Sequence, residues 1–385
     1  MKHFYLPLEK ELGNLQEKGL FRNLKIVEKK EGPYIWISGK RLLNLASNDY
    51  LGLAGRLSLK DLLPFLEEGD FGAGAARLLS GNHAYYEELE TFLEELYGRP
   101  VLFFNSGYLA NLAILTAFCG RHDGIFADKL VHASILDGAK LSGAKLFRFP
   151  HQDYEALEKL LFKKRATCKR ALIVSESIFS MDGDKTDLKA LLELKERFEA
   201  LLFIDEAHAI GIRGRKGLGL AEEFGLGPEI DILLGTCGKA LGSYGAFVVV
   251  SEKILKDYLI NKARPFIFTT ALPPIILAAT KKALSLLRSL EEERKHLRTI
   301  SLQMRKQLGL TENDTPIIPV IVGESKMALK LSQYLFEKGF YAPAIRPPTV
   351  PENTARLRLS LTAEHTFNLL DDLVQEIKSF LSKNS

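Results

Sequence analysis

A lysine without charged neighbours stands in the glycine-rich stretch at residues 235–246, GTCGKALGSYGA. Glycines surround Lys239, and no acidic residue lies in this window. A phosphate-binding P-loop requires Ser or Thr after its lysine, whereas Ala240 follows here. A lysine that forms a Schiff base must instead lose its proton, and an uncharged, partly desolvated loop favours the neutral amine. The stretch therefore indicates a nucleophilic lysine.

Asp205 and His208 follow the apolar run LLFID at residues 201–205. An aspartate in this place can simply cap the next helix. Residues 205–208 also spell DEAH, the acidic motif of one class of helicases, but that motif binds magnesium beside a P-loop, which the sequence lacks. A third interpretation is a buried carboxylate that pairs with the protonated nitrogen of a pyridine ring.

Polar residues follow several of the apolar runs. Five candidate strand ends carry them: Asn105–Tyr108, Asp128–His132, Ser175–Asp184, Asp205–His208 and Thr236–Lys239. In an open α/β sheet, ligands bind beyond the carboxyl ends of the strands. The amides of Gly107 and Tyr108 would form an anion site at the start of a helix. Phosphate donors, a pyridinium-pairing aspartate and a Schiff-base lysine together predict a pyridoxal 5'-phosphate site.

Short apolar runs, mostly separated by helix-length segments, predict the elements that position these residues. The runs are Val101–Phe104, Gly124–Ala127, Lys145–Phe149, Ala171–Val174, Ala200–Ile204, Asp231–Leu234 and Ala246–Val250. Runs of this length, rich in Val, Ile, Leu and Phe, indicate an α/β fold with a mostly parallel seven-stranded sheet covered on both faces.

The chain is expected to have three parts. Residues 1–45 form an N-terminal segment, residues 46–270 the large α/β domain and residues 271–385 a smaller C-terminal α+β domain. In the N-terminal segment we expect a polar helix and short strands near Tyr34–Ile37 and Leu42–Leu45. A helical stretch is expected from Ala271 to about Lys306. The elements predicted after it are strands Ile317–Val322 and Ala355–Leu361 and helices Lys326–Lys338 and Glu364–Leu381.

Composition excludes several classes of function. The chain has 385 residues, of which 46% are apolar and 26% charged, with a net charge of +4, as in globular proteins. Its basic runs are short, so no nucleic-acid partner is expected. Three scattered cysteines argue against a disulfide framework and a structural metal site. Neither a signal peptide nor a membrane-spanning run is present, so we expect a cytoplasmic protein.

Nine stretches together resemble the α-oxoamine synthases, which are fold type I pyridoxal-phosphate enzymes. The stretches are SNDYLGL (47–53), FGAGAARLLSGN (71–82), NSGY (105–108), ADKLVHAS (127–134), SESIFSMDGD (175–184), IDEAH (204–208), GTCGKALGSYGA (235–246), FTTALPP (268–274) and RPPTVPENTARLRLSLTAEH (346–365). The resemblance runs from about residue 19 to 380, nearly the whole chain.

The resemblance implies roles for individual residues. Lys239 would carry the cofactor and transfer the substrate proton, Asp205 would pair with the pyridinium nitrogen, and His132 would stack on the ring. The other implied cofactor contacts are Gly107, Tyr108, Ser180, His208, Thr236, Thr269 and Thr270. The implied substrate contacts are Arg22, Asn48, His132, Thr349 and Arg358.

The resemblance also implies a reaction. RPPTVP and TARLRLSLTA most resemble members of the family that condense L-alanine with a pimeloyl thioester, carried by coenzyme A or an acyl carrier protein, and release CO₂. A glycine-using synthase with another acyl thioester is the alternative within the family. A DEAH-type motor would need a P-loop, and a non-catalytic homologue would commonly lose the Schiff-base lysine, which this chain keeps.

The resemblance implies a homodimer, in which Thr269 and Thr270 reach the cofactor phosphate of the other subunit. From sequence alone, both threonines could equally hydrogen-bond locally in a turn. Tyr86 departs from the family, which usually has His at this position, and this puts a proton-relay role there in doubt. Arg356 and Arg358 share one face of a strand, and we expect Arg356 to be solvated while Arg358 binds the amino-acid carboxylate.

Overall fold

The computed structural model describes residues 2–58, 60, 62 and 71–384. Contacts group the chain into two compact units. The terminal unit contains Met1–Gly52, Met181–Gly183 and Lys295–Ser385, and the sheet unit contains Leu53–Ser180 and Asp184–Arg294.

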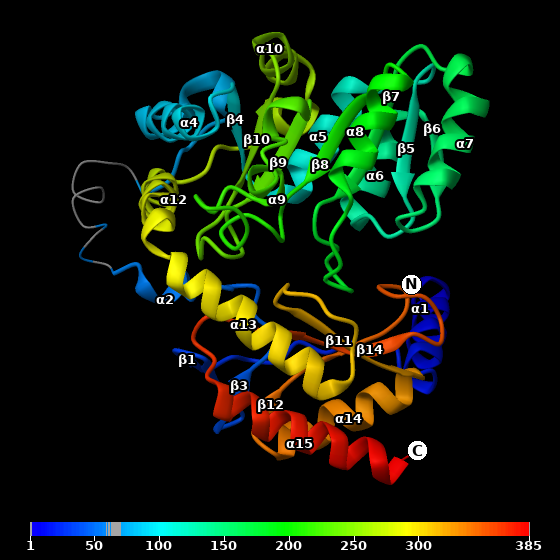
Figure 1. The fold of residues 1–385 in the computed structure, drawn as a ribbon, viewed down its shortest axis with the longest axis vertical. Coiled ribbons are helices and arrows are strands. Elements are labelled where there is room, and N and C mark those ends of the chain that lie inside the picture. The colour runs from blue at the N-terminus through cyan, green and yellow to red at the C-terminus, as the bar shows by residue number, and fades with distance from the viewer. Residues whose placement is uncertain (1, 59, 61, 63–70, 385) are drawn as a thin grey trace. The chain divides into compact units, whose positions relative to one another are not determined.

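A seven-stranded sheet forms the centre of the sheet unit, in the order β4-β10-β9-β8-β7-β5-β6 (Figure 1). Its strands are β4 (Val101–Phe104), β5 (Gly124–Asp128), β6 (Lys145–Phe149), β7 (Ala171–Glu176), β8 (Leu201–Asp205), β9 (Ile232–Thr236) and β10 (Ala246–Val250). Each strand agrees with a predicted apolar run to within two residues at either end. Among these seven strands β10 alone runs opposite to the other six. The prediction of a mostly parallel sheet is confirmed.

Helices connect and cover these strands. They are α2 (Leu53–Arg56), α4 (Ala84–Tyr97), α5 (Gly107–Phe118), α6 (Ala133–Ser142), α7 (Tyr154–Lys164), α8 (Leu188–Arg197), α9 (Leu220–Glu223), α10 (Lys253–Lys262), α11 (Arg264–Ile267) and α12 (Pro274–Leu286). Every residue of β5, β9 and β10 is buried. Burial of both alternating side-chain sets requires cover on both faces of the sheet, which is why these strands are continuously apolar.

The terminal unit contains two small sheets and the remaining long helices. The sheets have the orders β1-β2-β3-β12 and β11-β14-β13. The elements are α1 (Lys2–Glu17), β1 (Lys29–Glu31), β2 (Tyr34–Ile37), β3 (Lys40–Asn44), α13 (Glu291–Leu308), β11 (Ile317–Gly323), α14 (Ser325–Glu337), β12 (Phe340–Tyr341), β13 (Ala344–Ile345), β14 (Ala355–Ser360) and α15 (Phe367–Asn384). The residues of α13 from Lys295 onward belong to this unit.

A parallel strand pair joins the two ends of the chain within the terminal unit. In this pair Phe340 of β12 lies beside Leu43 of β3. Residues 1–45 and 271–385 were expected to be separate parts, whereas the contacts group the two ends together, with boundaries at 52/53 and 294/295 and with the added segment Met181–Gly183. A two-residue strand has no periodicity of its own, so its partner is decided only in the folded chain.

The helical stretch expected from Ala271 to about Lys306 is two helices, α12 and α13, separated by a short 3₁₀ turn at Leu287–Ser289. Arg294 Nη1 donates a hydrogen bond to the Leu287 carbonyl at 2.7 Å, which satisfies a backbone acceptor at this break.

Among the helices that the structure describes, none combines the length and the apolar composition needed to cross a membrane.

Candidate active site

The carboxyl ends of five strands meet at one edge of the seven-stranded sheet. β4 and β9 both run antiparallel to β10, and β9, β8, β7 and β5 pair in parallel, so all five point the same way. The polar segments singled out in the sequence follow these five strands. The sheet therefore places the segments that carry Gly107, His132, Ser180, Asp205 and Lys239 along the same edge, as parallel α/β sheets do with their ligand sites.

Asp205 ends β8 and is buried, with 5% of its surface exposed. Its Oδ1 accepts a hydrogen bond from the Ala207 amide at 2.9 Å, so the local capping role considered for this residue exists. Its Oδ2 accepts a second hydrogen bond at 3.0 Å from Asn111 Nδ2, which also donates to Ser134 Oγ. These donors stabilise a carboxylate, the form that pairs with a pyridinium nitrogen.

His132 immediately precedes α6, and its Nδ1 lies 2.7 Å from Ser134 Oγ. Its ring lies edge-to-face with that of Tyr108, with 6.5 Å between the ring centroids. Burial lowers the pKa of His132 below its usual value, and the nearby Lys239 lowers it too, although the Asp205 carboxylate opposes them. A neutral, flat imidazole results, and such a ring is suited to stacking on a cationic heterocycle.

Lys239 lies in a closely packed turn after β9. Its Nζ donates a hydrogen bond to Thr236 Oγ1 at 3.4 Å. Gly242 has a positive φ of 59°, and a Cβ added there would lie 2.1 Å from the backbone nitrogen of Ala54. The glycines around the lysine are therefore explained, at least at this position, by the approach of one backbone segment to another.

The predicted anion site lies at the start of α5. Ser106 caps the helix by accepting a hydrogen bond from the Leu109 amide at 3.3 Å, and α5 begins at Gly107. A Cβ added to Gly107 would lie 2.6 Å from Thr236 Cγ2, so α5 begins close to Thr236, the last residue of β9. The Tyr108 hydroxyl donates to Asp137, a contact that raises the pKa of this phenol. First-turn amides beside a threonine hydroxyl suit a phosphate group.

Glu176, at the end of β7, is a buried carboxyl group close to Asp205 and Lys239 that was not predicted as a site residue from the sequence. Burial raises its pKa well above the usual value, and the charge of Asp205 adds to this effect. Lys239 and the backbone amides of His132 and Ser180 act in the opposite direction. One carboxyl oxygen, Oε1, is buried without a hydrogen-bond partner among the described residues. Its place within SESIFS, directly after an apolar run, was the available signal.

The other expected cofactor contacts lie on neighbouring segments. Ser180 follows β7 and approaches Glu176 through its backbone. His208 is buried three residues after Asp205. The carbonyl of Thr270 accepts a hydrogen bond at 2.7 Å from Nδ2 of Asn105, the residue after β4. Thr269 lies beside Thr270 in the chain and is half-buried.

Tyr86 uses its hydroxyl as an acceptor. The Leu272 amide donates to Tyr86 Oη at 2.7 Å, and the Arg77 guanidinium lies 3.9 Å from the centre of the Tyr86 ring. Burial raises the pKa of this phenol. A buried, neutral hydroxyl that holds a backbone amide has a structural role in this chain.

Within the terminal unit, Arg358 and Asn48 are brought together. Arg358 Nη1 donates to Asn48 Oδ1 at 3.1 Å and to Ser360 Oγ, and Nη2 donates to Tyr50 Oη at 3.3 Å. These oxygens orient the guanidinium, which is 8% exposed, on β14.

Arg22 and Thr349 share a different part of the terminal unit. Arg22 Nη2 donates to the Pro347 carbonyl at 3.1 Å, and the Thr349 amide donates to the Arg346 carbonyl, also at 3.1 Å. Both predicted substrate contacts therefore lie on or against the turn at residues 346–349.

The expectation that Arg356 is solvated is wrong. Arg356 is 4% exposed, and its guanidinium forms an ion pair with Asp182. β14 lies between β11 and β13, and all its residues are buried. Alternation along a strand reports that two side chains share a face, but the neighbours that cover this face come from elsewhere in the chain.

These residues fit pyridoxal phosphate. Asp205 could hold the ring nitrogen, His132 a ring face, and Lys239 the aldehyde carbon. The amides at the start of α5 and the Thr236 hydroxyl could hold the phosphate. The absence of a Cβ at Gly107, where one would clash with Thr236, is an observation of this fold that agrees with a close phosphate cradle.

Comparisons with known proteins identify the family of this chain. A family model described as Aminotransferase class I and II matches residues 40–377. An 8-amino-7-oxononanoate synthase of Chlorobaculum parvum is 42% identical and the match covers 98% of this chain and 100% of that protein. A putative 8-amino-7-oxononanoate synthase of Geobacillus kaustophilus is 46% identical, over 92% of this chain and 93% of that protein.

Solved structures are similar as well. A serine palmitoyltransferase from S. paucimobilis, with a bound PLP-myriocin aldimine, has a TM-score of 0.91 at 29% identity, over 98% of this chain and 97% of that one. An 8-amino-7-oxononanoate synthase from Francisella tularensis has a TM-score of 0.76 at 31% identity, over 89% of this chain and 98% of that one. The chain therefore belongs to the aminotransferase class I and II family and, within it, to the α-oxoamine synthases, which are fold type I pyridoxal-phosphate enzymes.

Proposed function

We propose that the chain is an 8-amino-7-oxononanoate synthase of biotin biosynthesis. It would condense L-alanine with pimeloyl-CoA, or with a pimeloyl-carrier protein, to give 8-amino-7-oxononanoate, CO₂ and the free thiol. The observation that carries this proposal is the near-full-length identity of 42% and 46% with relatives of that name. The cofactor is pyridoxal 5'-phosphate, and the enzyme is an acyltransferase, as the family requires.

Pyridoxal phosphate, when bound, supplies a ring that delocalises the electron pair left on the amino-acid Cα. Asp205 would keep the ring nitrogen protonated through a charge-assisted hydrogen bond. Lys239 Nζ would remove the Cα proton and return one at the end of the reaction. His132 would cover one face of the ring and exclude water from it. Each of these residues lies at, or shortly after, the carboxyl end of a strand at the same edge of the sheet.

Electrons and atoms balance in this reaction. A bond forms between the alanine Cα and the acyl carbonyl carbon, and the thiolate leaves with the electron pair of the C–S bond. The alanine carboxyl group leaves as CO₂, and a proton replaces it at Cα. Arg358 would bind the carboxylate until it leaves, because a planar guanidinium matches a carboxylate with two hydrogen bonds. Asn48 and Tyr50 orient that guanidinium, while Arg22 and Thr349 would contact the acyl substrate.

The proposed assembly is a homodimer. Large apolar side chains are exposed on neighbouring segments of the sheet unit, namely Leu79 (82%) and Phe268 (69%). These segments are adjacent because Ala76 pairs with Thr270 in an isolated bridge. Exposed apolar side chains grouped in this way favour a protein partner. Thr269 and Thr270 follow Phe268 directly in the chain, as expected if they contact the cofactor phosphate of the second subunit.

A product assay tests the proposed function. The purified enzyme is incubated with alanine or glycine and with pimeloyl-CoA, a pimeloyl-carrier protein or acetyl-CoA, and the products are identified by mass spectrometry. We expect 8-amino-7-oxononanoate from alanine and a pimeloyl thioester. An aminoketone made preferentially from glycine would instead support the alternative synthase.

A cytoplasmic location stays a prediction from the sequence.

A further inference from the structure

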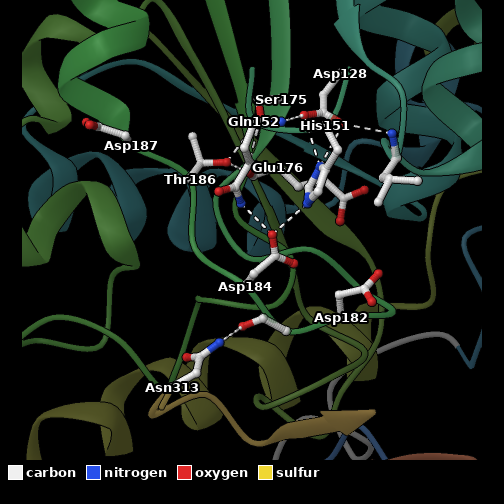
Figure 2. Close-up of polar contacts among 12 residues, drawn as sticks. Asp128, His151, Gln152, Ser175, Glu176, Asp182, Asp184, Thr186, Asp187 and Asn313 are labelled. Atoms are coloured by element: carbon white, nitrogen blue, oxygen red, sulfur yellow. Dashed lines mark hydrogen bonds and ion pairs between the residues drawn. The ribbon is translucent and has the colours of Figure 1, made fainter. Parts of the chain in front are cut away.

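A histidine outside the predicted site lies between two aspartates of the sheet unit. His151 follows β6, and Figure 2 shows its ring between Asp128 and Asp184, with Gln152 beside it. Nδ1 lies 3.0 and 3.1 Å from the two carboxylate oxygens of Asp128. Nε2 lies 2.6 Å from Asp184 Oδ2. The ring also packs edge-on against Phe179, with 4.4 Å between the centroids.

Both ring nitrogens of His151 face carboxylates, so both must donate and the imidazole must carry a proton on each. Burial opposes this charge, but the hydrogen bonds to Asp128 and Asp184 outweigh it and raise the pKa of His151 to about 10. His151 is therefore a cation at neutral pH, hydrogen-bonded to the carboxyl groups of Asp128 and Asp184 and so a bridge between them.

Asp128 ties this bridge to the segment that carries His132. It is the last residue of β5 and is buried. Besides His151, the Gln152 and Leu130 amides donate to its carboxylate, each at 2.8 Å. Leu130 lies in the short connection from β5 to His132, so the carboxylate of Asp128 holds this connection directly.

Asp184 ties the bridge to the segment that carries Ser180. The Phe179 amide donates to the Asp184 carbonyl at 3.0 Å, directly before Ser180. Ile178 and Lys185 form an isolated antiparallel bridge beside this contact. Gln152 Nε2 also donates to Asp184 Oδ2, while Oδ1 is buried without a partner among the described residues. The Asp184 carboxylate thus depends on His151 and Gln152.

The backbone of Gln152, the residue after His151, is in a strained conformation. Gln152 has a φ of +53°, a left-handed conformation that non-glycine residues rarely adopt. This conformation accompanies the bond from its amide to Asp128 and the bond from its side chain to Asp184. Strain of this kind persists only where surrounding contacts hold it, and it concentrates near functional sites.

We propose that His151 is a positioning residue, which joins the segment carrying His132 to the segment carrying Ser180 and so holds both in place for the cofactor. The proposal rests on the proposed function only in assuming that these segments contact pyridoxal phosphate. His151 itself would not touch the cofactor or the substrate. Its loss would leave two carboxylates facing each other, and the two segments would separate.

The test compares His151→Gln with a matched control, His122→Gln, which replaces an exposed histidine of the same unit. Apoenzyme is titrated with pyridoxal phosphate and the absorbance of the bound cofactor is followed. The exchange of the alanine and glycine Cα proton is then measured at saturating cofactor. We expect His151→Gln to weaken cofactor binding about tenfold, the factor that corresponds to one lost charge-assisted contact, and to slow exchange. His122→Gln should change neither.

A second variant keeps the test decisive if His151→Gln does not fold. Asp184→Asn removes one anion of the bridge at a side chain that is 34% exposed, and it should weaken cofactor binding in the same direction. In a double variant the two effects should combine to less than their product, because both act through one contact. Normal cofactor affinity and normal exchange in folded variants, with only a lower unfolding temperature, would overturn the proposal. Neither assay uses an acyl thioester, so a different condensation product would refute the proposed function without affecting this result.

Discussion

Lys239 is the residue on which the proposed chemistry depends most directly. We expect Lys239→Ala to abolish turnover while the protein still folds and binds pyridoxal phosphate non-covalently, because Asp205, His132 and the start of α5 are unchanged. Borohydride reduction of the wild-type holoenzyme followed by peptide mapping checks the assignment. The cofactor should be found on Lys239, and an adduct on any other lysine would refute it.

A substitution of Asp205 should affect catalysis much more than cofactor binding. Asp205→Asn keeps the shape of the side chain and one of its two acceptor oxygens, since Asn111 and Ala207 donate to different oxygens of Asp205, and we expect much of the cofactor affinity to remain. An amide cannot hold the ring proton, so activity should fall by about 100-fold or more, the scale seen when one charge-stabilising group is removed. The measurement is alanine Cα–H exchange at saturating cofactor. Near-normal exchange would mean that Asp205 only caps the chain after β8.

His151 predicts how stability depends on pH. Its pKa is about 10 in the folded protein and about 6.5 in an unfolded chain. The folded state therefore binds the extra proton, and the stabilisation is complete below about pH 6.5 and lost as the pH rises through about 10. Urea unfolding of apoprotein near pH 6, 8 and 10 should show that the free-energy difference between wild type and His151→Gln shrinks by about 2 kcal/mol, a figure reduced for solvent screening. A difference that stays constant would show that the ring is not charged.

At the scale of elements, a hydrogen bond joins α4 to the segment that precedes α12. Tyr86 on α4 accepts a hydrogen bond from the Leu272 amide. Tyr86→Phe keeps the ring over Arg77 but leaves a buried amide without its acceptor, so the free energy of unfolding should fall by about 1–3 kcal/mol. Chemical denaturation measures this loss. The control is Tyr258→Phe on α10. The ring of Tyr258 is partly exposed, so loss of its hydroxyl should have little effect on the free energy of unfolding. Equal stability of both variants would contradict the structural role given to Tyr86.

The sheet edge shows how elements turn a set of sequence segments into one site. The connections after β4, β5, β7, β8 and β9 each deliver polar residues to the same edge because these strands all point the same way. The strand β10, inserted antiparallel between β4 and β9, does not disturb this order. Helix α5 adds its N-terminus to this edge, and its first residue, Gly107, has no side chain that would block the approach of an anion.

At the scale of the whole molecule, a shared site predicts that two inactive chains can complement each other. One chain carries Lys239→Ala, and the other carries Thr269→Ala with Thr270→Ala. Random exchange makes half of the dimers mixed, and each mixed dimer has one site free of both lesions, so activity should recover to about a quarter of wild type. Light scattering and a tag on one chain establish that exchange has occurred. A monomer, or no recovery after proven exchange, would contradict the shared site.

The sequence by itself determined the central sheet and most of the candidate site. Each of the seven apolar runs became a strand. Continuous burial on both faces of a parallel sheet demands local stretches of Val, Ile, Leu and Phe, and only the edge strand β6 has most of its residues outside the core. The polar residues that end these runs were visible for the same reason, since they interrupt the apolar pattern. Lys239 stood out because its neighbours are uncharged and small, a purely local property.

Only the tertiary structure decided which distant segments meet. The pairing of β12 with β3, the burial of Arg356 and the raised pKa values of Glu176 and His151 all depend on residues remote in the chain. The periodicity of apolar residues predicts whether a side chain will be buried. Which residues pack against that side chain depends on the topology of the fold. The charge of a buried group depends on those neighbours through desolvation and hydrogen bonding, so it could not be assigned from local sequence.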